Sequence, residues 1–97
     1  MSAYVIFQGE VFDPDRYFGE YAGKAGASIT AAGGRLIAAG GKAEALEGEP
    51  PMSHNVVVEF PTMDAALAWY RSEEYTQIRK LRAGAARTRM YVVDGTG

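Results

Sequence analysis

The basic residues of this 97-residue chain are concentrated in its last third. Six of the ten lysines and arginines lie between Arg71 and Arg89, close to Tyr70 and Tyr75. Two arginines can clamp a small carboxylate, and basic residues with aromatics can bind nucleic acid. The formal net charge is −2, whereas nucleic-acid affinity normally needs a broad positive field. We therefore expect no nucleic-acid partner.

His54 is the only histidine, and its ordinary pKa near neutrality suits a general base. Ser53 adjoins it, but neighbours on a strand point to opposite faces, so the two make a poor nucleophile–base pair. The simpler interpretation is that His54 only begins a strand after a proline-rich turn. Both interpretations stay open from the sequence.

The sequence contains no residue pattern typical of a metal-binding or cofactor-binding site. The chain has no cysteine, which excludes disulfides, thiolate metal sites and a cysteine nucleophile. Asp13 and Asp15 flank Pro14 and are better explained as residues that start a helix. The glycines of "GGKAEA" lack the spacing of a phosphate-binding loop. We expect no metal and no cofactor.

These side chains must be positioned by elements that alternate in type. Strands are predicted at residues 3–11, 35–41, 54–60 and 87–95, and helices at 13–34 and 63–72, with helical continuation to 84. The resulting order, strand, helix, strand, strand, helix, strand, is that of the ferredoxin-like fold. We predict one α+β domain over residues 1–97, with a four-stranded antiparallel sheet in the order 4-1-3-2 and both helices on one face.

Each face of the predicted sheet has its own composition. The apolar face consists of Val5, Phe7, Val56, Val58, Phe60, Met90 and Val92. It should lie under the helices, against a stripe formed by Tyr17, Tyr21, Ala25 and Ile29. The opposite face, which we name the mixed face, carries Tyr4, Ile6, Gln8, Glu10, Asn55, Val57, Glu59, Arg87, Arg89 and Tyr91. A sheet face of this composition usually meets another surface. In the connection before His54, Leu46 is expected to anchor a β-hairpin.

The run "AYVIF…DPDRYFGEY…GGRLIAAGG…LEGEPP…VVVEFPTMDAALAWYRSEEYTQIRKLR…ARTRMYVVDG" resembles the family called domain of unknown function 1330. That family resembles the dimeric α/β-barrel superfamily, in which two ferredoxin-like protomers place their sheets face to face. The resemblance therefore implies a homodimer through the mixed face. Relatives often have His and Arg before the two Gly-Gly pairs, where this chain has Ala32 and Ala39.

Four charged residues of the mixed face have two interpretations. Glu10, Glu59, Arg87 and Arg89 could pair their charges at the dimer seam, or the arginines could clamp a small carboxylate. We favour charge pairing. Arg79 and Arg82 are expected on a solvated helix flank.

Two functions remain open, and the sequence leaves undecided whether the chain is an enzyme. The first is a cofactor-free pocket that binds or transforms a small organic molecule between helices and sheet. Its candidate residues are Tyr17, Tyr21, His54, Trp69, Tyr70 and Tyr75. The second is a non-catalytic homodimeric binding or stress-associated module, in which these aromatics only fill the core. The absence of a signal-peptide pattern and of a run of ~20 apolar residues indicates a cytoplasmic protein with no membrane partner.

Overall fold

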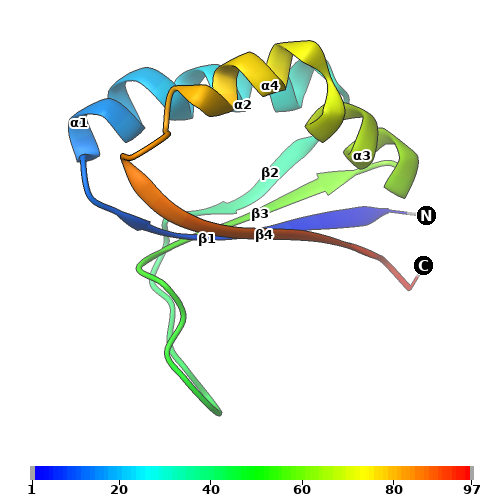
Figure 1. Cartoon of the computed structure of the whole chain (residues 1–97). Helices are drawn as coiled ribbons and strands as arrows, with labels where there is room; N and C mark the ends of the chain where they lie inside the picture. Colours follow the sequence, from blue (N-terminus) through cyan, green and yellow to red (C-terminus); the bar gives the residue numbers. More distant parts are fainter. Residues whose placement is uncertain (1, 97) are drawn as a thin grey trace.

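The computed structural model describes residues 2–96. A four-stranded antiparallel sheet in the order β2-β3-β1-β4 carries all the helices on one face (Figure 1). The elements in chain order are β1 (Ala3–Val11), α1 (Pro14–Arg16), η1 (Tyr17–Ala22), α2 (Gly23–Ala31), β2 (Arg35–Ala39), β3 (His54–Phe60), α3 (Met63–Arg71), α4 (Glu73–Lys80) and β4 (Ala86–Asp94). The predicted fold class and strand order are confirmed.

The first helical stretch starts as expected and then widens. The carboxylate of Asp13 accepts a hydrogen bond from the backbone N–H of Arg16 at 3.2 Å, and Pro14 occupies the first turn. Between Tyr17 and Ala22 the chain forms a π-helical segment, which the sequence did not predict. The wider turn leaves Tyr17 and Tyr21 on the buried side.

Two further helices begin at side-chain caps. The hydroxyl of Thr62 accepts a hydrogen bond from Ala65 N at 3.0 Å, and that of Ser72 accepts one from Tyr75 N at 3.1 Å. The extended backbone of Ser72 separates α3 from α4. Trp69, rather than Tyr70, is the aromatic that α3 buries.

The core lies between the helices and the apolar face of the sheet. Val5, Phe7, Val58 and Phe60 are buried there, while Val56, Met90 and Val92 pack against them half-buried. The register pairs Val5 with both Val58 and Val92, so the apolar residues of three strands form one continuous surface. The predicted division of the sheet into two faces is confirmed.

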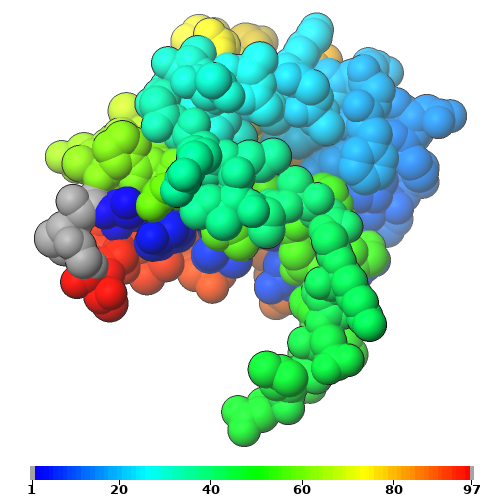
Figure 2. Space-filling view, turned by 180° about the vertical axis from the view of Figure 1, so that it is seen from behind, coloured from blue at the N-terminus to red at the C-terminus, as the bar shows by residue number. Residues whose placement is uncertain are grey.

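The connection between β2 and β3 is an extended arm. Residues 40–53 leave the sheet on the side away from the helices and project well beyond it (Figures 1 and 2). Strands β2 and β3 pair as a hairpin, but Leu46 is 89% exposed within this arm. The expectation that Leu46 anchors the hairpin is therefore wrong, because no other part of the described chain covers it.

No helix within residues 2–96 combines the length and the apolar character that a membrane crossing would need.

Candidate binding cavity

A cavity of about 260 Å³ lies between the helices and the side of the sheet formed by β2 and β3. Its walls combine residues of the sheet, η1, α2 and α3. They are Val5, Phe7, Tyr17, Phe18, Tyr21, Ala22, Ala25, Gly26, Ile29, Leu36, Ala39, His54, Val56, Val58, Trp69 and Met90. This volume is slightly below the range typical of ligand pockets, about 300–1,000 Å³.

His54 is the polar side chain of this otherwise apolar and aromatic wall. Its ring lies edge-on to the rings of Tyr17, Phe18 and Phe7, with centroid distances of 5.5, 5.3 and 6.3 Å. Burial lowers the pKa of His54 below its ordinary value of 6.5. The imidazole is therefore neutral near pH 7, and one of its nitrogens keeps a free lone pair.

A cluster of two tyrosines and an arginine lies at the cavity wall, which it reaches through Tyr21. The hydroxyls of Tyr21 and Tyr75 are hydrogen-bonded at 2.6 Å, and the guanidinium of Arg82 lies 5.3 Å from the Tyr21 ring centroid. Burial raises the pKa of Tyr21, Tyr75 and Tyr17, the last to about 12. All three phenols are therefore neutral at physiological pH. The positive charge of Arg82 lowers their pKa values, but by less than burial raises them.

Arg82 is not on a solvated flank, so that expectation is wrong. Its side chain folds inward over the rings of Phe7 and Tyr21 and donates a hydrogen bond to Thr88 Oγ1 at 3.0 Å. The helix sequence alone gave no sign of this direction. The two tyrosines on the apolar sides of their helices, Tyr21 and Tyr75, were the available signal, since buried hydroxyls need polar neighbours.

We expect Tyr75→Phe to lower the free energy of unfolding by about 1 kcal/mol, because Tyr21 then loses a buried hydrogen-bond partner. Tyr21→Phe should behave alike. Because the double change leaves neither hydroxyl unpaired, its effect should be smaller than the sum of the two. Urea denaturation of the three variants measures this coupling, and strictly additive effects would contradict a shared hydrogen bond.

Trp69 forms the inner wall of the cavity and is held rigidly. Its indole N–H donates a hydrogen bond to Ser28 Oγ at 3.0 Å. The centroid of its ring lies 4.2 Å from the centroid of the Tyr75 ring and 5.5 Å from that of the Phe60 ring. Trp69 is also the only tryptophan of the chain. Its fluorescence therefore responds to a ligand in this cavity, although Trp69 also borders the second cavity under α3.

The structure divides the six candidate pocket residues. Tyr17, Tyr21, His54 and Trp69 line the cavity together, whereas Tyr75 lies behind Tyr21. Tyr70 faces a second cavity of about 270 Å³ under α3, and its hydroxyl accepts a hydrogen bond from Arg79. Trp69 and Tyr75 are also core residues, so the pocket and core interpretations overlap.

The wall also contains residues that were not among the candidates, and three of them border its edge or replace a residue of relatives. Phe18 is half exposed where it contacts His54, and Leu36 comes from the edge strand β2. Ala39 also lines the cavity, at the position where relatives often have arginine, whereas Ala32 does not. No sequence pattern distinguished these three residues from other apolar side chains.

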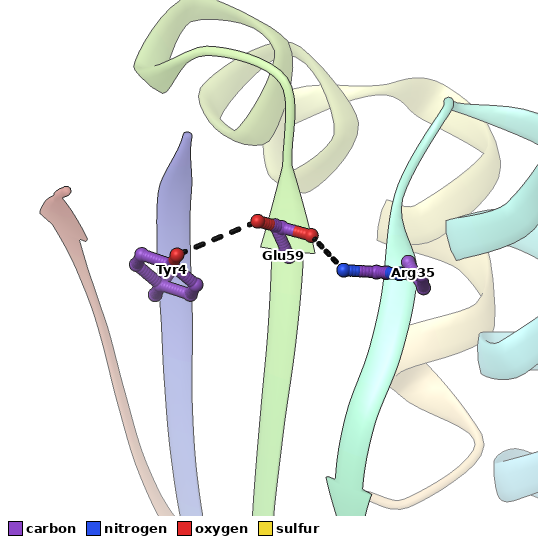
Figure 3. Close-up of polar contacts among 3 residues, drawn as sticks. All are labelled: Tyr4, Arg35 and Glu59. Atoms are coloured by element: carbon purple, nitrogen blue, oxygen red, sulfur yellow. Dashed lines mark hydrogen bonds and ion pairs between the residues drawn. The ribbon is translucent and has the colours of Figure 1, made fainter. Parts of the chain in front are cut away.

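Polar side chains on the mixed face make contacts that differ from those expected. Glu59 accepts hydrogen bonds from Arg35 at 2.6 Å and from Tyr4 at 3.4 Å (Figure 3). Hydrogen bonds from Ser2 and Arg35 lower the pKa of Glu59. Arg35, which the sequence did not single out, provides the one ion pair among residues 2–96.

Glu10 lies opposite Arg87 in the register, as expected. Its carboxylate, however, accepts hydrogen bonds from the backbone N–H and the hydroxyl of Ser53 at 3.1 and 3.2 Å. Arg89 donates to Gln8 at 3.2 Å. Pairing of Glu10 with either arginine is therefore not seen within residues 2–96. The same described residues contain no cluster of three or more acidic or histidine side chains able to hold a metal ion.

The element order, sheet topology and one-sided helical layer define a ferredoxin-like α+β fold. The chain belongs to the family described as domain of unknown function DUF1330, whose model matches residues 2–96. No curated protein matches the sequence.

Several solved structures share the fold. RPA0582, a protein of unknown function from Rhodopseudomonas palustris, is 19% identical, with a TM-score of 0.73 over 99% of this chain and 83% of the other. SnoaB, a cofactor-independent oxygenase from Streptomyces nogalater, is 8% identical, with a TM-score of 0.69 over 99% and 94%. A dimeric protein of unknown function with a ferredoxin-like fold from Bacteroides fragilis is 14% identical, with a TM-score of 0.61 over 97% and 96%. At these identities, the likeness shows the fold alone.

Proposed function

We propose that this protein binds, and transforms without a cofactor, a small and largely apolar organic molecule in the cavity beside His54. The observation that carries the proposal is a neutral imidazole within an apolar and aromatic wall. Such a wall with a few well-placed polar groups is typical of small-molecule sites. The cofactor-independent oxygenase SnoaB, which shares the fold, supports chemistry without a cofactor.

The neutral state of His54 defines what it can do. With a lone pair available near pH 7, it can accept a proton from a weakly acidic group such as a phenol or an enol. The phenols of Tyr17 and Tyr21 stay protonated because their pKa values are raised. They can therefore donate hydrogen bonds but not act as bases. An aromatic ring bearing an acidic hydroxyl fits both the stacking surfaces and the base.

Filling the cavity from its mouth tests the proposal. Gly26 lines the cavity in α2, and a Cβ placed on it would have no atom within 4 Å. Gly26→Leu should therefore occupy the mouth and weaken binding of 1-naphthol at least about tenfold, or ~1.4 kcal/mol. Quenching of Trp69 fluorescence measures the affinity.

Gly23→Leu is the matched control, because Gly23 also has open space around it but does not line the cavity. It should bind 1-naphthol as the unmodified chain does. Equal binding by both leucine variants, or no binding by the unmodified chain, would contradict a ligand site in this cavity.

The second candidate is a homodimeric binding module with no catalytic role. Its support is the mixed face, where Tyr91 is 60% exposed and Val93 is 46% exposed on the side that the helices leave uncovered. The dimeric neighbour from Bacteroides fragilis shares the fold. We propose that two copies pack through this face. We also propose a cytoplasmic location, because a chain without cysteine suits a reducing compartment. Native mass spectrometry would report both the dimer and any retained ligand, and a monomer at micromolar concentration would contradict the assembly.

A further inference from the structure

The arm has no packing partner in its own chain. All residues from 41 to 50 are exposed, and they project on the side of the sheet that the helices leave free (Figures 1 and 2). Five residues out and five back can reach at most about 17 Å, at ~3.3 Å per residue. Two sheets packed face to face lie only about 10 Å apart. The arm is therefore long enough to cross such an interface.

The root of the arm is fixed to the sheet, so its direction is built into the fold. Met52 N donates to the side-chain oxygen of Gln8 at 3.1 Å, and Ser53 N donates to Glu10 at 3.1 Å. Arg89 donates to the same oxygen of Gln8 at 3.2 Å. Two of the mixed-face residues assigned to the seam, Glu10 and Arg89, thus take part in positioning the arm.

Charge distinguishes the arm from the surface at its root. The arm carries Lys42 and three carboxylates, Glu44, Glu47 and Glu49, and so is acidic. Beside its root lies a hollow of about 410 Å³, bordered by Glu10, the residues from Glu49 to Met52, and the exposed arginines Arg87 and Arg89. Neither arginine forms an ion pair within residues 2–96.

Symmetry relates this hollow to the arm of a second copy. A two-fold axis parallel to the strands places the β2 edge of one sheet opposite the β4 edge of the other, at the same end of the strands. Each arm then rises beside the start of the other copy's β4, where Arg87 and Arg89 lie. The other in-plane axis would bring the arm to Arg35, whose charge Glu59 already balances.

We propose that residues 41–50 are a clasp that enters the hollow of a second copy and sets its carboxylates against the partner's Arg87 and Arg89. This inference rests on the homodimer proposed above and adds its symmetry axis and its contacts. The two clasps are equivalent, because each copy gives an arm and receives one.

Charge reversal tests the clasp. Replacing Glu44, Glu47 and Glu49 with lysine should raise the dimer dissociation constant at least about tenfold at low salt, since each contact occurs twice. Arg87→Glu with Arg89→Glu should weaken the dimer similarly. Combining both sets should restore the dissociation constant to within about threefold of the original. Sedimentation equilibrium measures all three.

The control must change the net charge equally without touching the clasp. A control variant that meets this condition replaces three exposed glutamates of the helical layer with lysine, namely Glu20, Glu73 and Glu74. Its dissociation constant should stay near that of the unmodified chain. Equal weakening by the control and arm variants, or no rescue in the combined variant, would overturn the clasp.

Cross-linking distinguishes a failure of the proposed clasp contacts from a failure of the dimer to form. Because the chain has no cysteine, Glu47→Cys on one chain and Arg87→Cys on a size-tagged chain give a single pair of thiols. A short bis-maleimide should join the two different chains. A sample that sediments as a dimer without this mixed product would contradict the clasp and leave the dimer standing. A sample that stays monomeric would overturn both.

Discussion

Replacing Phe60 with alanine is expected to lower the free energy of unfolding by about 3–5 kcal/mol. Phe60 is 0% exposed at the end of β3, and its ring packs 5.5 Å from that of Trp69. Gly34 brings the chain leading into β2 close to the same ring. Because these neighbours come from different elements, they cannot all move into the space left behind, and a cavity remains. Urea denaturation with a fixed m-value measures the loss.

Phe12→Ala is the matched control, because Phe12 is 66% exposed and lies after the end of β1. The same substitution there should change the free energy of unfolding by at most about 0.5 kcal/mol. If Phe60→Ala lost less than about 1 kcal/mol, Phe60 could not lie in the central core that the structure assigns to it.

Gly34→Ala is expected to destabilise the fold by about 1–3 kcal/mol through overpacking. A Cβ at Gly34 would lie 2.8 Å from Ile29 Cγ2 and 2.8 Å from Phe60 Cε1. Both contacts are closer than carbon atoms tolerate, and both neighbours are buried and cannot swing away. Thermal and urea denaturation should both show the loss.

Gly23→Ala makes the same chemical change in open space. Gly23 has ordinary helical dihedral angles and no atom within 4 Å of an added Cβ. The alanine should therefore stabilise the protein by about 0.5–1 kcal/mol, because glycine weakens a helix interior. Two Gly→Ala changes of opposite sign would show that close packing, not glycine content, requires Gly34. Effects of the same sign would contradict this.

Much of the fold follows from local patterns that tertiary contacts reinforce. Alternation in β1 and β3 predicted which side chains face the helices, because neighbouring residues of a strand point in opposite directions. The hydroxyls of Thr62 and Ser72 start two helices by accepting hydrogen bonds from backbone N–H groups three residues ahead, a contact that depends only on the local sequence. These elements depend on residues close together in the chain.

The remaining features depend on residues that are far apart in sequence. Arg82 follows the end of α4, and its side chain packs over the rings of Phe7 and Tyr21, both of which are far from it in the sequence. The cavity is the space left over when several elements pack, and a sequence pattern does not describe empty volume. The π-helical segment changes the hydrogen-bond spacing without changing which tyrosines are buried, so periodicity alone did not reveal it.

The predicted charge pairing on the mixed face also depends on contacts between residues far apart in the sequence. Glu10 and Arg87 are register partners, as the antiparallel placement of the last strand beside the first predicts. The carboxylate of Glu10 instead binds Ser53, because the returning arm brings backbone donors to it. The direction of the arm could not be read from "GGKAEALEGEPPMS", whose glycines and prolines are compatible with many turns.

The central claim is that His54 is a neutral base in an apolar cavity that accepts a ligand, and NMR titration of its single imidazole tests this most directly. The claim predicts a titration midpoint below 6.5, the ordinary value for histidine, and ring resonances that shift when 1-naphthol is added. A midpoint at or above that value, with ring signals indifferent to 1-naphthol, would contradict it.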